Sequence, residues 1–216
     1  MANPQFRDRT EAGQLLAARL SRYANRQDVL VLALPRGGVP IAYEIAQTLQ
    51  ADLDLCLVRK LGVPGQPELA MGAIASGGFR VMNTEIVESL HISERQVLQV
   101  ATLEQAELER RQRLYRGDRP ALAIRDRTVI LVDDGIATGA TLRAALAVLK
   151  PQQPRAIVIA VPIASPHSFR AFQSLVDEII CLATPELLHS IGQYYKDFSQ
   201  TSDQQVCQLL ARSTLF

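Results

Sequence analysis

The sequence predicts an α/β fold with a mostly parallel sheet and helices on both faces. The first observation is a series of short, mostly apolar segments, at residues 29–34, 53–58, 129–132, 156–161 and 178–182, in which only Asp54 and Glu178 are charged. Largely apolar segments of this length are typical of strands that are covered on both faces. The second observation is that helical patterns alternate with these runs, and repeated strand–helix–strand units imply parallel pairing.

The N-terminal elements are a helix and a buried strand. Residues 10–23 carry leucines and alanines at helical spacing, and Thr10 is the expected N-cap. The strand at 29–34 then stops at the sequence Pro-Arg-Gly-Gly-Val-Pro, before a helix at 41–49. A glycine-rich turn between a strand and a helix lies at the carboxyl end of the strand, where α/β sheets bind ligands.

The turn after the first strand contains Arg36, Gly37 and Gly38. The two glycines would let the backbone come close to an anion, and Arg36 would add a positive charge. The alternative is that the glycines only permit a tight turn and that Arg36 is solvated. A second candidate phosphate loop later in the chain favours the anion site.

The apolar run at 53–58 leads into Arg59 and Lys60, followed by a loop at 61–68 that is rich in glycine and proline. This basic pair is either a pair of ligand contacts at the end of a strand or an ordinary solvated pair. The loop also contains an isolated acid, Glu68, which is either a general base toward an incoming nucleophile or a simple loop charge.

A hairpin and a helical stretch follow. Residues 69–76 and 79–82 read as strands on either side of a Gly-Gly pair, which predicts a hairpin. Helices are predicted over 84–90 and 93–115, and the second of them opens with a serine N-cap and an acid in the first turn. Its later arginines either face a phosphate or form a solvated, salt-bridged surface.

The strand at 129–132 begins the most specific pattern of the chain. Asp133 and Asp134 end it, and small residues from Gly135 to Thr141 lead into a helix. The N–H groups and the dipole at a helix N-terminus favour an anion, and small side chains let a phosphate reach them. Since the two carboxylates would repel that phosphate, they must serve sugar hydroxyls or a metal ion. A phosphorylated ribose with a metal-bound pyrophosphate offers all of these groups.

The C-terminal part adds two strands, at 156–161 and 178–182, and a closing helix at 201–212. Between the last strand and this helix lies an aromatic cluster. Aromatic residues make up only 5% of the chain, so their concentration in the sequence Tyr-Tyr-Lys-Asp-Phe at 194–198 indicates a specific role. Packing of the C-terminal segment is one such role.

Composition argues against several classes of function. The 23 basic and 22 acidic residues nearly balance, so the charge expected of a nucleic-acid-binding protein is missing. The chain has no apolar run of 18 residues, no apolar core of a secretory signal and no G-x-x-x-x-G-K-[ST] loop. Three well-separated cysteines fit a reducing compartment, and the expected location is the cytoplasm.

The strand, the acid pair and the Thr-Gly-x-Thr loop resemble the signature of the type I phosphoribosyltransferases. The segments Leu-Pro-Arg-Gly-Gly-Val-Pro, Val-Arg-Lys-Leu-Gly, Pro-Glu-Leu-Ala-x-Gly-Ala and Tyr-x-Asp-Phe extend the resemblance over residues 30–205, to a branch of predicted phosphoribosyltransferases without a settled substrate. The resemblance implies one such domain over residues 1–216, with a flap hairpin and a C-terminal hood at about 184–216. A helical insert at about 84–119 departs from the compact purine enzymes, and we expect it to be a lid or a dimer element.

The resemblance also implies a donor, phosphoribosyl pyrophosphate (PRPP), and the residues that contact it. The candidate catalytic residues are Asp133 and Asp134, which would hold the ribose hydroxyls, and Glu68. The candidate PRPP-binding residues are Ala137, Thr138, Gly139, Ala140, Thr141, Arg36, Gly37, Gly38, Arg59 and Lys60, with Lys60 favoured over Arg59. The candidate acceptor-binding residues in the hood are Tyr194, Tyr195, Asp197 and Phe198, with packing as their alternative role.

The function implied by the resemblance is transfer of a phosphoribosyl group from PRPP to a nitrogenous acceptor in nucleotide metabolism, with release of pyrophosphate. Mg²⁺ is the expected cofactor, held mainly by PRPP with Asp133 and Asp134 as additional ligands and without a dedicated metal site. The expected partners are PRPP, a small-molecule acceptor and a second copy of the chain, and neither nucleic acid nor a membrane. The alternatives are a PRPP-sensing regulator without catalysis and a hydrolase or phosphorylase of a phosphorylated ribose.

Overall fold

The computed structural model describes residues 5–76, 78–117 and 119–213, except for the side chain of Glu68. Within this part the chain forms two compact units, each with a sheet of its own. The first unit comprises residues 5–56, 122–138 and 154–213, and the second comprises the described residues of 57–121 and 139–153. The single domain predicted over residues 1–216 stays a prediction.

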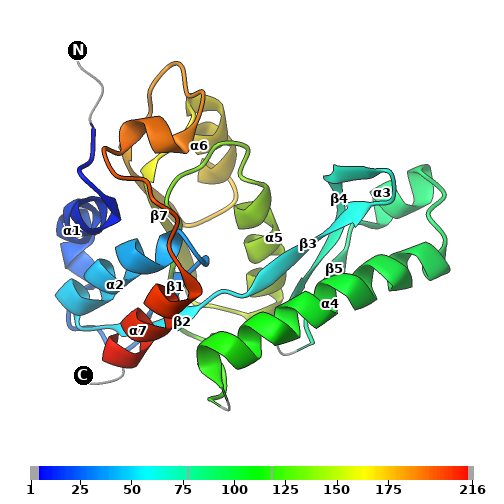
Figure 1. Cartoon of the computed structure of the whole chain (residues 1–216), viewed down its shortest axis with the longest axis horizontal. Coiled ribbons are helices and arrows are strands. Elements are labelled where there is room, and N and C mark those ends of the chain that lie inside the picture. The colour runs from blue at the N-terminus through cyan, green and yellow to red at the C-terminus, as the bar shows by residue number, and fades with distance from the viewer. Residues whose placement is uncertain (1–4, 77, 118, 214–216) are drawn as a thin grey trace. The chain divides into compact units, whose positions relative to one another are not determined.

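The first unit is built on a five-stranded parallel sheet with the strand order β2-β1-β6-β7-β8 (Figure 1). Its strands are β1 (Val29–Ala33), β2 (Asp52–Leu55), β6 (Thr128–Val132), β7 (Ala156–Ile163) and β8 (Glu178–Ala183). Every residue of β1 and β6 is buried, as expected for central strands that are covered on both faces. Ala33 pairs with Val132, so β1 and β6 end side by side. The predicted α/β fold with a parallel sheet is confirmed.

Helices lie on both sides of this sheet. α1 (Arg9–Arg19) and α2 (Gly38–Leu49) pack against each other on one side, and α6 (Pro166–Gln173) lies on the other (Figure 1). The remaining helical segments of the first unit are η1 (Ser21–Tyr23), η3 (Ile191–Tyr194) and α7 (Asp203–Ser213). Because β1 and β6 are parallel and end side by side, the turn after β1 and the loop after β6 both start from the same edge of the sheet.

The N-cap of α1 differs from the sequence-based expectation. Asp8 caps the helix, because its carboxylate accepts a hydrogen bond from the backbone N–H of Glu11 at 2.8 Å. The prediction of Thr10 as the cap is wrong, since Thr10 lies inside the first turn. Asp and Thr are both good N-caps, so local preference alone does not choose between them. The consequence is that Arg9 becomes the first helical residue.

The second unit contains an antiparallel sheet with the strand order β3-β4-β5. Its elements are β3 (Val58–Val63), β4 (Gln66–Ala75), β5 (Arg80–Met82), α3 (Thr84–Ser89), α4 (Glu94–Arg116), α5 (Ala140–Leu149) and η2 (Lys150–Gln152). α4 runs along the small sheet (Figure 1), and both α4 and α5 contact β3 and β4. The predicted hairpin is confirmed as β4 and β5, with Gly77 outside the described residues.

The longest described helix, α4, confirms the predicted helical insert and its serine cap. Ser93 and Gln96 form a capping box at its N-terminus. Glu107 accepts hydrogen bonds from Arg110 and Arg111, each at 2.7 Å, and the Arg110 guanidinium is the main reason that the pKa of Glu107 falls to about 2. These pairs favour the salt-bridged interpretation of the late charges. Neither α4 nor any other helix in the described ranges is both long and apolar enough to cross a membrane.

The apolar run at 53–58 holds the end of one strand and the start of another. β2 ends at Leu55, and Val58 already pairs with Ala75 in the antiparallel sheet. The prediction of one strand that ends in Arg59 and Lys60 is therefore wrong, because both residues lie inside β3. Apolarity does not separate two buried strands when their pairing partners are distant in sequence.

Candidate functional site

Asp133 and Asp134 follow β6 directly, at the carboxyl edge of the parallel sheet. The backbone N–H of Asp134 donates a hydrogen bond to Asp133 Oδ1 at 2.9 Å, so the first carboxylate turns back onto its own chain. Both residues are partly buried, and the side chain of Asp134 is 19% exposed. The two carboxyl groups thus occupy the edge at which parallel sheets bind their ligands.

The glycine-rich turn after β1 lies against this acid pair. A Cβ atom added at Gly37 would lie 2.0 Å from Asp134 Oδ2. One added at Gly38 would lie 2.6 Å from the carbonyl oxygen of Val132. Any side chain at either position would collide with the end of β6, so the glycines are what allow the turn and the acids to meet.

Arg36 precedes the two glycines in the same turn. Its peptide bond with Pro35 is cis, and its side chain is partly exposed. Its Nη1 lies 3.7 Å from Oδ1 of Asp203, the first residue of α7. The first unit therefore brings a cation, a close-packed glycine turn and the acid pair to one edge of its sheet.

Arg9, the first residue of α1, contacts the acid pair directly. Its Nε and Nη2 donate hydrogen bonds to Asp134 Oδ2 at 3.0 and 2.8 Å, and its Nη1 donates to the carbonyl oxygen of Ser199 at 2.7 Å. The guanidinium carbon lies 4.0 Å from the centroid of the Phe198 ring, within the range of a cation–π interaction. The Arg9 side chain is only 10% exposed, so this ion pair is shielded from solvent.

Tyr195 holds the backbone of the acid pair. Its hydroxyl donates a hydrogen bond to the carbonyl oxygen of Asp134 at 2.8 Å, and burial raises its pKa above the ordinary value. The neighbouring Tyr194 is equally buried, and its hydroxyl donates to the carbonyl oxygen of Leu187 at 3.2 Å. The structure thus gives both tyrosines a packing role, and acceptor contact through them stays a prediction.

Phe198 and Asp197 are less buried than the two tyrosines. The Phe198 ring packs against that of Tyr195, with 4.9 Å between the centroids. Asp197 is exposed and accepts a hydrogen bond from the backbone N–H of Ser199 at 2.9 Å, which lowers the pKa of its carboxyl group. Acceptor contact through Asp197 and Phe198 also stays a prediction.

The ionisation of Asp133 is shifted by its surroundings. Removal from water, reinforced by the negative charge of Asp134, raises the pKa of Asp133 to about 8. The hydrogen bond from the Asp134 N–H and the charge of Arg9 act in the opposite direction but are weaker. Near neutral pH the acid pair therefore keeps a proton on Asp133, while Asp134 is ion-paired with Arg9.

This raised pKa predicts a pH-dependent cost in stability. The folded-state value of about 8 exceeds the ordinary 3.8, so the favourable contribution of the protonated group is fully present below pH 4 and is lost as the pH rises through 8. Asp133→Asn does not ionise and retains an oxygen to accept the Asp134 N–H. We expect the difference in free energy of unfolding, variant minus wild type, to increase by roughly 1 kcal/mol for each pH unit between pH 5 and 8. Urea unfolding at several pH values measures the difference, and a constant difference contradicts the prediction.

The small-residue loop at 137–141 leads into α5. Gly139 is the N-cap, with a φ of 73°, so no side chain caps this helix, and the first turn contains no acidic residue. The carbonyl oxygen of Ala137 accepts a hydrogen bond from the Ser168 hydroxyl at 2.6 Å. The helix predicted after the acid pair is confirmed, and the binding of a phosphate at its N-terminus stays a prediction.

Three further candidates lie in the second unit. Arg59 and Lys60 are on β3, and the Arg59 Nε lies 2.5 Å from Oε2 of Glu104 on α4. Glu68 is on β4, and its side chain lies outside the described residues. The ion pair engages Arg59 within its own unit, and the roles assigned to Lys60 and Glu68 stay predictions.

Arg9 is the site residue for which the sequence predicts no role. A cation at the first position of a helix opposes the helix dipole, so an arginine there indicates a specific carboxylate partner. The expected cap at Thr10 hides this signal, because it places Arg9 outside the helix. Recognising Asp8 as the cap would have drawn attention to Arg9.

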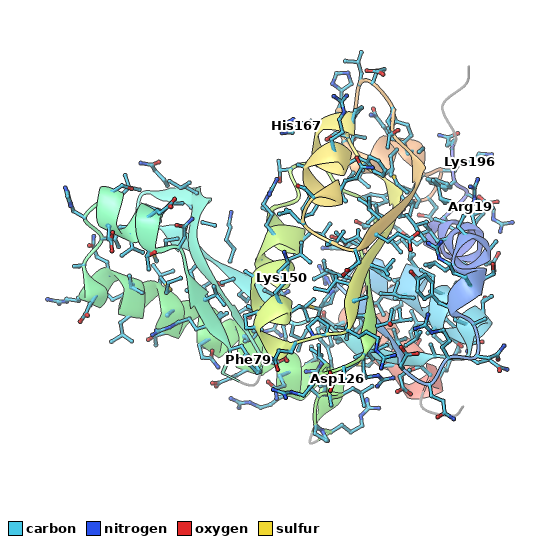
Figure 2. The ribbon with its side chains drawn as sticks, turned by 180° about the vertical axis from the view of Figure 1, so that it is seen from behind. Arg19, Phe79, Asp126, Lys150, His167 and Lys196 are labelled. Atoms are coloured by element: carbon cyan, nitrogen blue, oxygen red, sulfur yellow. The ribbon has the colours of Figure 1, made fainter. Side chains whose placement is uncertain are left out.

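The acids offer part of a magnesium coordination shell. Carboxylate oxygens are the hard ligands that Mg²⁺ prefers, but Asp134 Oδ2 is engaged by Arg9 and Asp133 Oδ1 by a backbone N–H. In the part of the chain that the structure describes, no group of three or more His, Cys, Asp or Glu side chains is arranged to hold a metal ion. His167, which is exposed near the start of α6, belongs to no such group (Figure 2). The acids therefore offer some, but not all, of the oxygen ligands that a magnesium ion needs.

Comparison with known sequences points to one family. Residues 7–184 match the sequence profile of the phosphoribosyl transferase domain. Two Mycobacterium tuberculosis proteins named provisionally as phosphoribosyl transferases, MT0597 of strain CDC 1551 and Rv0571c of strain H37Rv, are each 45% identical to the chain over 208 residues. The match covers 96% of this chain and 47% of each relative, so the chain spans about half their length.

Comparison with solved structures finds chains of similar fold. The crystal structure of TT1426 from Thermus thermophilus is similar to this chain with a TM-score of 0.88 and 39% identity, over 96% of this chain and 98% of that one. AQ2163 from Aquifex aeolicus is similar with a TM-score of 0.52 and 13% identity, over 94% and 84% of the two chains, a likeness that shows the fold alone. The acid pair, the glycine turn and Arg9 all lie within the matched profile.

Proposed function

The chain belongs to the phosphoribosyltransferase family, and from this membership we propose that it moves a phosphoribosyl group from PRPP to a nitrogenous small molecule with release of pyrophosphate. The observation that carries the proposal is the close approach of the glycine turn to the acid pair, where Gly37 leaves no room for a Cβ beside Asp134. Carboxylates accept hydrogen bonds from sugar hydroxyls, while glycine-rich turns at helix starts bind anions. PRPP carries both kinds of group on one ribose.

Each part of the substrate has a proposed contact. Asp133 and Asp134 would hold the ribose hydroxyls, and the loop at 137–141 would bind the 5-phosphate at the N-terminus of α5. The turn from Arg36 to Gly38 would bind the pyrophosphate, with Lys60 as a further cation. The support for this assignment is the uncapped start of α5, which has a glycine N-cap and no acid in its first turn.

The proposed chemistry is displacement at the anomeric carbon. The bond from C1 to the pyrophosphate oxygen breaks, positive charge builds on the ribose, and the acceptor nitrogen forms the new bond to C1. The negative field of the acid pair stabilises that charge, and the hydrogen bonds to the hydroxyls keep C1 in line with both groups. Glu68 is the candidate to take the proton that the acceptor nitrogen loses.

Mg²⁺ would supply charge neutralisation for the departing pyrophosphate. On the protein side, the oxygens of Asp133 and Asp134 that are not already hydrogen-bonded would hold it, with the remaining ligands from PRPP and water. This division of ligands follows from the engagement of Asp134 Oδ2 by Arg9.

The proposal extends to assembly and location. We propose a homodimer in which the helical insert is a dimer arm or a lid. Its support is the exposure of leucines on α4, where Leu98 and Leu103 are 61% and 74% exposed. We propose the cytoplasm as the location, which agrees with Cys56, Cys181 and Cys207 forming no disulfide within the described residues.

The test is calorimetric titration of the protein with PRPP in the presence and absence of Mg²⁺, followed by a pyrophosphate-release assay across purines, pyrimidines and other amines. Magnesium-dependent binding with release that requires one acceptor is the expected result. Binding without release under any condition would instead favour a PRPP sensor, and release into water alone would favour a hydrolase. Absence of PRPP binding would overturn the proposal.

A further inference from the structure

Asp134 is held by groups from both ends of the chain. Arg9 of α1 donates two hydrogen bonds to one carboxylate oxygen, and Tyr195 of the C-terminal segment donates one to the backbone carbonyl. Within the described ranges the other carboxylate oxygen, Oδ1, makes no hydrogen bond. The carboxylate therefore has one oxygen committed to Arg9 and one still available to a ligand.

We propose that Arg9 is a positioning residue of the PRPP site, which holds the Asp134 carboxylate in one orientation and directs its second oxygen to the ribose hydroxyls. The proposal rests on the proposed function, because it takes PRPP as the ligand of the acid pair. Arg9 acts through Asp134 in this account and makes no contact with the substrate.

The contacts of Arg9 differ from those of an ordinary surface ion pair. Its side chain is only 10% exposed, and its third donor, Nη1, is bound to the carbonyl oxygen of Ser199. The ring of Phe198 covers the guanidinium plane at 4.0 Å. A planar, forked cation that is held on three sides gives its partner one defined orientation, which an exposed and mobile pair does not.

The helix that carries Arg9, α1, packs tightly against a neighbouring helix. α1 packs against α2, and a Cβ added at Gly13 would lie 2.9 Å from the carbonyl oxygen of Ile41. α2 begins at Gly38, in the turn that touches the acid pair. The position of Arg9 is thus coupled through packed helices to the turn that we propose for pyrophosphate binding.

The charge of Arg9 has a second consequence for a phosphorylated ligand. Two adjacent carboxylates would repel PRPP, which carries several negative charges. The Arg9 guanidinium, whose Nη2 lies 2.8 Å from Asp134 Oδ2, offsets the charge of that carboxylate. The site then accepts hydrogen bonds from hydroxyls without an excess of negative charge beside the phosphates.

The proposal predicts that the forked shape of Arg9 matters as well as its charge. The guanidinium makes two hydrogen bonds to Asp134 Oδ2 and a third to the carbonyl oxygen of Ser199. A lysine at position 9 can keep the positive charge beside Asp134 but cannot reproduce this planar set of donors.

The experiment compares Arg9→Gln and Arg9→Lys with Arg19→Gln as the matched control. Arg19 is the last residue of the same helix and is exposed (Figure 2). Magnesium-dependent PRPP affinity is measured by calorimetry at pH 7, and folding by circular dichroism. We expect Arg9→Gln to weaken binding about 10- to 100-fold. Arg9→Lys keeps the charge but not the fork, so it should recover part of the affinity and still bind about 3- to 10-fold less tightly than the wild type, and Arg19→Gln should bind like the wild type.

The outcomes separate the two proposals. If the wild type does not bind PRPP, the proposed function fails. If the wild type binds and Arg9→Gln binds equally well, or both Arg9 variants lose affinity by the same factor, the positioning role is overturned while the proposed function stands. If Arg9→Gln does not fold, the folded Arg9→Lys variant decides, since wild-type affinity in that variant overturns the proposal and a loss of about 3- to 10-fold supports it.

Discussion

Replacing both acids, in the double variant Asp133→Asn and Asp134→Asn, is expected to abolish magnesium-dependent PRPP binding, with a loss of at least about 100-fold. In the proposed complex Asp134, which is ion-paired with Arg9, accepts a charge-assisted hydrogen bond from a ribose hydroxyl, and such a bond contributes about 1.5–3 kcal/mol. Asp133, which keeps its proton near neutral pH, accepts an ordinary hydrogen bond that contributes about 0.5–1.5 kcal/mol. Together the two bonds correspond to a factor of about 100 or more. The amides retain the shape of the acids but lose the charge, so the Arg9 guanidinium would also be left without an anionic partner.

The matched control lies at the opposite end of the same strand. Asp126 precedes β6, is exposed, and has a φ of 60°, a conformation that asparagine adopts readily (Figure 2). Asp126→Asn should therefore bind PRPP like the wild type in the same calorimetric titration. Unchanged magnesium-dependent binding by the double variant would remove the acid pair from the site and would end the assignment of PRPP to this edge of the sheet.

Gly37→Ala is the second change with a large expected effect. The new Cβ would lie 2.0 Å from Asp134 Oδ2, an atom that two hydrogen bonds from Arg9 hold in place. Either the turn or the carboxylate must move, and we expect a loss of about 1–3 kcal/mol in stability. PRPP affinity should fall about 100-fold, because the change disturbs both the proposed pyrophosphate turn and the proposed ribose contact. Urea unfolding and calorimetry measure the two effects.

A double-mutant cycle with Asp134→Ala separates steric collision from a general disturbance of the turn. Without the carboxylate, the alanine at position 37 no longer meets Oδ2, so Gly37→Ala should destabilise the Asp134→Ala background less than the wild type. The expected coupling is at least about 1 kcal/mol in the free energy of unfolding. Additive effects would show that the 2.0 Å approach is not what makes glycine necessary.

The central sheet and the acid pair follow from local patterns. β1 and β6 read as strands because every residue is apolar or β-branched, and both are buried in the structure. The acids come next in sequence to β6, so their place at the carboxyl edge needs only that strand to be parallel to its neighbours. The proximity of the glycine turn to the acids follows from the same rule, since both β1 and β6 end at that edge.

The second unit was predictable only in part. Its hairpin and its long helix have clear local signals, in the turn residues and in the capping box. The boundary within residues 53–58 has none, because Val58 is as apolar as the strand before it. Its membership in β3 depends on pairing with Ala75, which lies far along the chain. Arg59 and Lys60 consequently lie inside an antiparallel strand, whereas the sequence predicted them at the end of a parallel strand.

The fold class, the buried strands and the two acids at a strand end could all be predicted from the sequence, because each of these depends on residues that are neighbours in the chain. The contacts of Arg9 with Asp134, and of Tyr195 with the Asp134 backbone, became visible only in the folded chain. These contacts join residues that are 125 and 61 positions apart. Their geometry depends on how α1 and the C-terminal segment pack onto the sheet, and no local pattern of polarity encodes a meeting between segments so far apart.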